Sequence, residues 1–144
     1  MIRRLEQRDR ETYLAMAAEF YQSDAVDHPI PAAFAERTFA ALMEGSPYAE
    51  GYLFEEKGTA QGYALLAKTW SQEAGGEVIW VEELYVRPEF RGQGQGQRFF
   101  DVLMREKKPA RFRLETEPDN RRAKALYARQ GFRMLNYDTF ILGD

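Results

Sequence analysis

The sequence Arg87-Pro-Glu-Phe-Arg-Gly-Gln-Gly-Gln-Gly-Gln-Arg-Phe-Phe100 carries the strongest pattern in the chain. It follows an apolar run at positions 78–86, whose β-branched and aromatic residues are typical of a buried strand. After it, apolar residues recur at positions 99–104 with the spacing of one helix face. The stretch therefore predicts a strand, a glycine-rich loop and a helix in succession.

The composition of this loop is typical of a site that binds phosphate. Gly92, Gly94 and Gly96 leave backbone amides open to a ligand, because no Cβ stands in the way. Free amides at a helix N-terminus attract anions, and Arg91 adds a positive charge. The loop lacks the Lys-Ser/Thr of a P-loop, and its glycines recur too closely for the dinucleotide fingerprint. A glycine-rich turn without any ligand is the alternative.

A second pattern follows at positions 120–132, which read Asn-Arg-Arg-Ala-Lys-Ala-Leu-Tyr-Ala-Arg-Gln-Gly-Phe. Asn120 is a favourable N-cap, and Ala123, Leu126 and Tyr127 share one face of the helix that it would begin. Gly131 predicts the end of that helix in the left-handed conformation. These residues therefore predict a short capped helix.

The two patterns together resemble the GNAT superfamily of acyl-CoA-dependent N-acetyltransferases. The first resembles the family's Q/R-x-x-G-x-G/A loop, which binds the pyrophosphate of acyl-CoA, and the second its N-x-x-A-x-x-L-Y-x-x-x-G-F segment. Both lie in the C-terminal half of the chain, and the N-terminal half matches only in its order of elements. The resemblance implies an α/β fold with a central mixed, mostly antiparallel twisted sheet flanked by helices.

The periodicity along the chain predicts the same order of elements. We expect a single domain over residues 1–144 and a sheet with helices around it. The expected strands are 2–5, 48–55, 61–70, 78–86, 110–116, 132–135 and 137–142, the last two as a terminal pair. The expected helices are 9–21, 32–44, 98–107 and 120–130.

Composition narrows the functional classes. The chain has no cysteine and one histidine, which excludes disulfides and cysteine nucleophiles and makes a zinc site improbable. No apolar run has the length of a membrane span and no signal peptide is recognisable, so we expect a cytoplasmic protein without a membrane partner.

Charge is unevenly distributed along the chain. Residues 87–133 contain 13 Lys and Arg against 6 Asp and Glu, whereas the remainder contains 7 against 17. A basic half suits the phosphates of CoA and an acidic half suits a cationic amine, although both could be solvated faces. The net charge of −3 argues against a nucleic-acid partner.

The resemblance also implies positions for the cofactor, acetyl-CoA. Its pantetheine would lie beside the strand that precedes the loop, like an added strand, with Val86 as a backbone donor. The implied contacts are Leu84, Tyr85, Val86, Arg91, Gly92, Gln93, Gly94, Gln95, Gly96, Gln97, Asn120, Ala123 and Tyr127.

Two residues are candidates for the chemistry. Tyr127 matches the family tyrosine near the CoA sulfur, where a phenol could supply the proton that the departing thiolate needs, although it could also only pack. Glu82 matches a carboxylate that contacts the acceptor amine in polyamine-acetylating relatives, and it could accept the amine's proton. Glu83 is expected on the opposite face of the strand. Solvated surface charges are the alternative for both carboxylates.

The loop between the first two expected helices borders the acceptor site in the family. His28 could act there as a base, although a histidine in a turn before proline is commoner. Asp24 and Asp27 could recognise a cationic acceptor.

We therefore expect direct transfer of an acetyl group from acetyl-CoA to a small primary amine, such as a polyamine, amino acid or aminoglycoside. A protein N-terminal or lysine acetyltransferase is one alternative, and a non-catalytic acyl-CoA-binding sensor is another. Trp70 and the final strand are candidate surfaces for a homodimer.

Overall fold

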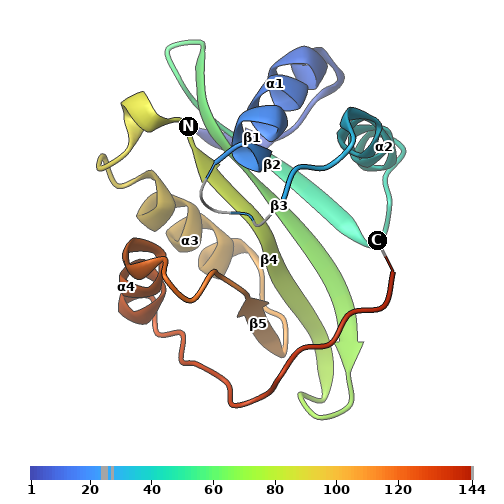
Figure 1. Cartoon of the computed structure of the whole chain (residues 1–144), viewed down its shortest axis with the longest axis vertical. Coiled ribbons are helices and arrows are strands. Elements are labelled where there is room, and N and C mark those ends of the chain that lie inside the picture. The colour runs from blue at the N-terminus through green and yellow to red at the C-terminus, as the bar shows by residue number, and fades with distance from the viewer. Residues whose placement is uncertain (24–25, 27, 144) are drawn as a thin grey trace.

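The computed structural model describes residues 1–23, 26 and 28–143. Its core is a five-stranded sheet in the order β1-β2-β3-β4-β5 (Figure 1). The strands are β1 (Ile2–Arg4), β2 (Ala49–Glu56), β3 (Thr59–Ser71), β4 (Gly76–Val86) and β5 (Arg111–Leu114). All neighbours pair antiparallel except β4 and β5, which are parallel. The mixed, mostly antiparallel sheet predicted from the sequence is thus confirmed.

Helices cover both faces of this sheet. One layer holds α1 (Arg10–Tyr21) and α2 (Ala32–Met43), and the other holds α3 (Gln95–Glu106) and α4 (Arg121–Arg129). Two short 3₁₀ turns, η1 (Gln7–Asp9) and η2 (Pro88–Phe90), precede α1 and the glycine loop. The order of these elements agrees with the periodicity of the sequence up to residue 131.

Each face of the sheet has its own hydrophobic cluster. On the α1–α2 face, Tyr13, Met16 and Phe39 pack against Tyr63 and Tyr85 from the strands. On the α3–α4 face, Phe99 and Phe100 pack against Ile79 and Val81 of β4. Because burial of large apolar side chains is the main stabilising term in folding, these two clusters fix the helices on the sheet.

Two expectations about element boundaries are wrong. The helix expected at 98–107 begins at Gln95, inside the glycine loop, because Gly94 takes the left-handed conformation at the N-cap with φ of 78°. The strand pair expected at 132–135 and 137–142 is absent from the described residues. The described chain there has no regular secondary structure, because no neighbouring strand supplies hydrogen-bond partners. Phe132 packs against Phe100, whereas the large apolar side chains from Met134 onward are exposed. We refer to residues 133–143 as the C-terminal tail.

None of the helices in the described residues has the length and apolar character needed to cross a bilayer. The same residues contain no group of three or more His, Cys, Asp or Glu side chains that could hold a metal ion.

Candidate active site

The glycine loop leaves a row of backbone amides without partners. Gly92 and Gly94 adopt φ of 76° and 78°, a conformation that side-chain-bearing residues rarely take. The first loop-to-helix hydrogen bond is donated by the amide of Arg98, to the carbonyl of Gly94 at 3.0 Å. Within the described chain, the N–H groups of residues 92–97 therefore donate no hydrogen bond. Six free donors at the start of α3 form a cradle that fits a pyrophosphate.

The adjoining edge of β4 also has open backbone groups. The pairing of β4 with β5 ends at Val81 and Leu114, so the two strands diverge beyond this point. The amide of Arg87 donates to Gln61 on β3 at 2.8 Å. Because peptide groups alternate in direction along a strand, those of Leu84 and Val86 point away from β3, toward the open edge. This edge fits an amide-rich ligand lying as an added strand.

Arg91 occupies part of that edge. Its Nε donates to the Val86 carbonyl at 2.8 Å, and its guanidinium lies 5.8 Å from the centre of the Tyr85 ring. The exposed Arg91 side chain thus connects the strand edge to the glycine loop. Its positive charge lies where the open strand edge and the glycine loop meet.

Helix α4 closes the other side of the loop. The Asn120 side chain caps it by accepting a hydrogen bond from the Ala123 amide at 3.1 Å, and Gly131 follows the helix with φ of 95°, both as the sequence predicts. A Cβ on Gly96 would lie 2.9 Å from Leu126, so the glycine permits α3 and α4 to approach closely. Tyr127 is half-buried at the same cleft, and burial raises the pKa of its phenol.

The glutamines of the loop have different surroundings. Gln93 and Gln97 are exposed, and Gln97 Nε2 donates to Asp101 at 3.2 Å. Gln95 is 5% exposed and its side-chain amide donates to Gln61 of β3. The Gln95 side chain therefore connects the start of α3 to the sheet. Of its polar groups, the backbone amide is the one that belongs to the row of free donors in the loop.

A bulge in β4 changes the expected geometry of Glu82 and Glu83. Leu66 pairs with Val81 and Leu65 pairs with Glu83, so Glu82 is an extra residue without a partner on β3. The expectation that the two carboxylates point to opposite faces rested on regular alternation, which the extra residue interrupts. Both line the same cleft. The Glu82 side chain is exposed at the surface of the cleft. Partial desolvation there, followed by the negative charges of Glu83 and Glu115, raises its pKa.

Glu83 is held by two tyrosines that sequence reasoning did not identify. Tyr63 on β3 donates to its Oε1 at 2.6 Å, and Tyr21 at the end of α1 donates to its Oε2. Burial and the charge of Glu83 raise the pKa of both phenols. A second unexpected contact lies nearby, where Glu19 accepts hydrogen bonds from Tyr85 at 3.0 Å and from Arg87.

The loop between α1 and α2 contains the three residues predicted to border the acceptor site. Asp24 and Asp27 lie outside the described residues. His28 is exposed at the rim of the cleft and forms no hydrogen bond with the described part of the chain.

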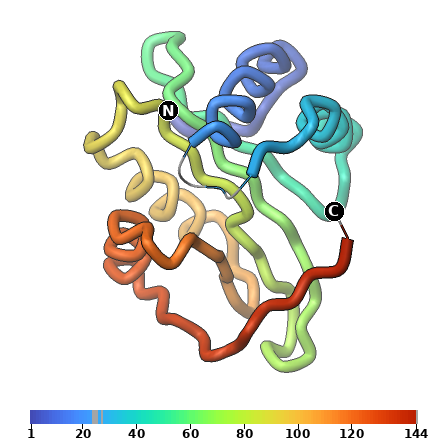
Figure 2. The backbone as a smooth tube through the Cα atoms, in the orientation of Figure 1, coloured from blue at the N-terminus to red at the C-terminus, as the bar shows by residue number. Residues whose placement is uncertain are grey.

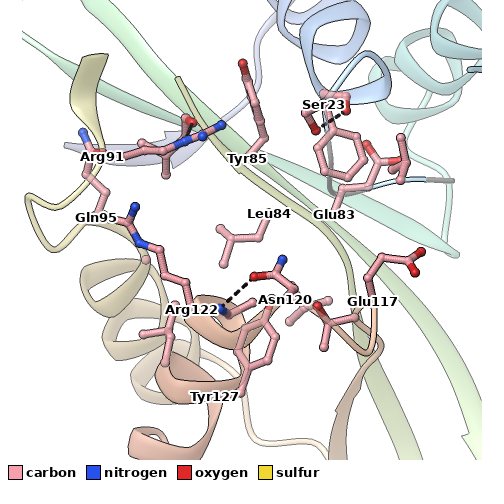
Figure 3. A pocket seen from close by; sticks show the side chains of 18 of the residues that line it. Ser23, Glu83, Leu84, Tyr85, Arg91, Gln95, Glu117, Asn120, Arg122 and Tyr127 are labelled. Carbon is pink, nitrogen blue, oxygen red and sulfur yellow. Dashed lines mark hydrogen bonds between the residues drawn. The ribbon is translucent and has the colours of Figure 1, made fainter. Parts of the chain in front are cut away.

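The cleft as a whole has charges of opposite sign at its two ends. Figure 3 shows Arg91 and Arg122 on one side of Leu84, and Glu83 and Glu117 on the other. Glu82 and Glu115 also line the cleft. One continuous cleft thus has free backbone amides at one end and carboxylates at the other.

Comparison with known proteins identifies the family of this chain. The model of the Acetyltransferase (GNAT) family matches residues 8–132. The chain belongs to the GNAT acetyltransferase family. An aminoglycoside N-acetyltransferase with the same fold, AAC(6')-Iy, has been solved in complex with CoA, which agrees with acetyl-CoA as the cosubstrate.

Relatives of this GNAT protein act on different acceptors. A thialysine N-epsilon-acetyltransferase from Sus scrofa is 34% identical over 76 residues, which are 51% of this chain and 42% of that relative. The match thus spans less than half the length of the relative. An aminoglycoside acetyltransferase, AAC(6')-Iy in complex with a bisubstrate analogue, has a TM-score of 0.82 at 15% identity, with 100% and 97% of the two chains covered. A ribosomal-protein-alanine N-acetyltransferase from Brucella melitensis has a TM-score of 0.75 at 20% identity, with coverage of 100% and 99%. At these identities the two structures show a shared fold.

Proposed function

We propose that this GNAT protein transfers the acetyl group of acetyl-CoA directly to the primary amine of a small cationic molecule. The observation that carries the proposal is the continuity of one cleft, from the free amides of residues 92–97, along the open edge at Val86, to the carboxylates of Glu82 and Glu83. The amides suit the pyrophosphate, the strand edge suits the amides of pantetheine, and the carboxylates suit an ammonium group.

The reaction needs a proton acceptor, because an ammonium has no free electron pair. We assign this role to Glu82, which lines the cleft and whose pKa is raised by partial desolvation and by its acidic neighbours. A carboxylate with a raised pKa is a better base near neutral pH than an ordinary one. Glu83, with both oxygens held by tyrosines, supplies negative charge that orients the ammonium and supports the basicity of Glu82.

The deprotonated amine then attacks the thioester carbonyl carbon, so that a C–N bond forms and the C–S bond breaks. As the amide forms, the nitrogen releases its second proton to solvent, and solvent restores the proton of the acid that protonates the sulfur. The N–H of Val86, which points to the open edge, would polarise the thioester carbonyl oxygen, because a preorganised donor lowers such a barrier. Tyr127 would supply a proton to the departing sulfur, and a protonated phenol can do so. No acyl-enzyme is needed, and proximity in the cleft supplies much of the rate.

The acidic end of the cleft favours an acceptor with more than one positive charge. Glu115 and Glu117, just after β5, lie in the cleft together with Glu82 and Glu83. A second ammonium on the acceptor would meet these carboxylates. The relative that is named for thialysine, an amino acid with a side-chain amine, agrees with such an acceptor.

The test is release of CoA thiol from acetyl-CoA with a panel of amines. The chain has no cysteine, so a thiol reagent reports CoA alone. The panel pairs a linear diamine with the monoamine of equal length, and adds an aminoglycoside, a lysine-like amino acid and a peptide with a free N-terminus. We expect a higher kcat/KM for the diamine than for its matched monoamine. Binding of acetyl-CoA without release for any amine would favour a sensor, and release with the peptide alone would favour a protein acetyltransferase.

A further inference from the structure

The side chain of Arg91 is held by very few contacts within the described chain. Its exposed guanidinium donates one hydrogen bond, from Nε to the Val86 carbonyl, and forms no ion pair with a described carboxylate. Arg87 differs, because its side chain donates to both oxygens of Glu19 and to the Ala60 carbonyl. An exposed side chain with a single hydrogen bond changes its conformation at small cost. Arg91 is therefore able to move, whereas Arg87 is fixed.

The backbone at Arg91 is held in place, so that this movement is confined to the side chain. The 3₁₀ turn η2 ends at Phe90, and the Arg91 amide donates to the Pro88 carbonyl at 3.3 Å. Gly92, the first residue of the row of free amides, follows directly along the chain, and Figure 2 traces the backbone from β4 through this turn into the loop. Rotation of the Arg91 side chain alone would carry its guanidinium from the strand edge to the amide cradle.

The contact of Arg91 uses a backbone group that a ligand on this edge needs. The Val86 carbonyl points away from β3, because the next residue, Arg87, donates to Gln61 on β3 and peptide groups alternate in direction. A ligand lying as an added strand would donate one of its amides to this carbonyl. In the free protein the Nε–H of Arg91 takes that place. Figure 3 shows the Arg91 side chain directed along the strand toward Tyr85.

We propose that Arg91 selects the carrier of the acetyl group, by blocking the strand edge unless a diphosphate offers its guanidinium another partner. The inference rests on the placement of acetyl-CoA proposed above. The pantetheine arm has to break the hydrogen bond between Arg91 and Val86 before it lies along β4. With CoA, the displaced guanidinium meets the diphosphate in the amide cradle, and a charge-assisted hydrogen bond replaces the one that is lost. With pantetheine alone, the guanidinium meets only water.

Competition for the Val86 carbonyl lowers the affinity of every ligand that lies along this edge. A ligand that binds only the open state has an apparent Kd that is raised in proportion to how rarely that state is populated. One net hydrogen bond corresponds to roughly 2- to 10-fold in affinity. Loss of Arg91 should therefore have opposite effects on two ligands, with tighter binding of pantetheine and weaker binding of CoA. An arginine that only attracted phosphate would leave the binding of pantetheine unchanged.

The test is the Kd of CoA and of pantetheine, which share one arm, measured by amide NMR titration of the wild type and two variants. We expect Arg91→Ala to bind pantetheine roughly 2- to 10-fold more tightly than the wild type, and CoA roughly fivefold or more weakly. Arg122→Ala is the matched control. Arg122 is exposed and lies next to Gly92, without a hydrogen bond to the strand edge in the described residues. This variant should weaken the binding of CoA and leave that of pantetheine unchanged.

The outcomes separate this proposal from the placement of acetyl-CoA. Unchanged or weaker binding of pantetheine by Arg91→Ala, with CoA still bound by the wild type, would overturn the role of Arg91 alone. An equal gain for pantetheine in Arg122→Ala would assign the effect to net charge and overturn it as well. A wild type that binds neither ligand would contradict the placement of acetyl-CoA, and this proposal with it.

The Nε–H signal of Arg91, identified by its absence from Arg91→Ala, reports the displacement directly. Saturation with pantetheine should shift this signal, and CoA should move it to a different position. The reason is that the Nε–H leaves the Val86 carbonyl for water in the first complex and for phosphate in the second. A signal that stays unchanged at saturation with pantetheine would show that the contact with Val86 persists beside the bound ligand, and would overturn the proposal.

Discussion

Tyr63 donates a hydrogen bond to Glu83 Oε1 at 2.6 Å, and this contact joins the middle of β3 to the centre of the cleft. With Tyr21 on the other oxygen, both acceptor atoms of the carboxylate are engaged by phenols. Hydrogen bonds to a charged acceptor are stronger than neutral ones, so this arrangement stabilises negative charge. Glu82 is the adjacent residue at the bulge, and its proton affinity depends on that charge.

The first prediction concerns the pH dependence of turnover. Partial desolvation raises the pKa of Glu82, and the charges of Glu83 and Glu115 raise it further. A base works in its deprotonated form, so kcat/KM should fall as pH drops through this raised pKa. Glu83→Gln removes one negative neighbour, lowers the pKa of Glu82, and should move the acidic limb to lower pH. The measurement is the pH profile of kcat/KM for both proteins with the same amine.

Glu82→Gln provides the control for this assignment. It should remove the acidic limb that Glu83→Gln only shifts, and lower kcat by roughly 100-fold or more. An unchanged limb in Glu82→Gln would show that another group accepts the proton.

The second prediction concerns Tyr127. Its ring lies 5.9 Å from Phe100 and 6.1 Å from Phe132, between centroids, and phenylalanine preserves this packing. Tyr127→Phe should therefore lower kcat by roughly 10- to 100-fold with little change in the Kd of acetyl-CoA. Tyr52→Phe removes a different hydroxyl, which donates to Glu50 at 3.1 Å, and should leave kcat unchanged. Equal turnover by the two variants would assign Tyr127 to packing alone.

The third prediction separates ligand binding from backbone strain. Gly94 and Gly58 have φ of 78° and 79°, and an alanine in either place costs about 1–2 kcal/mol. Gly94 belongs to the amide cradle, whereas Gly58 lies in the β2–β3 turn, where an added Cβ would have no neighbour within 4 Å. Gly94→Ala should raise the Kd of acetyl-CoA about tenfold or more, because strain displaces several donors. Calorimetry should give the wild-type Kd of acetyl-CoA for Gly58→Ala. A similar loss of acetyl-CoA affinity in both variants would indicate a global effect of backbone strain.

The fourth prediction concerns stability in acid. Glu50 is 6% exposed, and burial would raise its pKa, but hydrogen bonds from Lys107 and Lys68 outweigh that effect and lower the pKa to about 2. A carboxylate with a lowered pKa stabilises the fold above its unfolded value of 4.5, and this contribution disappears as pH falls toward 2. The loss should be on the order of 2 kcal/mol.

The free energy of unfolding in denaturant, measured at pH values between 4.5 and about 2, gives the size of this loss of stability. Glu50→Gln should be less stable than the wild type near neutral pH and should show a flatter dependence of the unfolding free energy on pH. Glu36→Gln, an exposed substitution on α2, should keep the wild-type slope. A wild-type slope in Glu50→Gln would contradict the role of this carboxylate.

Local signals explain which parts of the site the sequence could predict. The cap by Asn120 and the helix end at Gly131 depend on a few neighbouring residues, so the sequence predicts both. The order of strands and helices up to residue 131 follows from periodicity in the same way.

Contacts across the fold could not be predicted in this manner. Glu83 is held by Tyr21 from α1 and Tyr63 from β3, which are 62 and 20 residues distant in sequence. The direction of the Glu82 side chain depends on a bulge in β4, and that bulge depends on the register between β4 and β3. The sequence of residues 133–143 predicts strands because these residues have high β-propensity. A strand also needs a neighbouring strand to pair with, and propensity does not indicate whether one is present.

Binding of acetyl-CoA in this cleft is tested most directly by an amide NMR titration of the labelled protein with that ligand. We predict that the amides of residues 92–97 and those of Leu84 and Val86 shift together and saturate, while the Lys57–Gly58 turn does not respond. Absence of binding, or shifts confined to residues outside the loop and the β4 edge, would contradict the assignment of this cleft to acetyl-CoA.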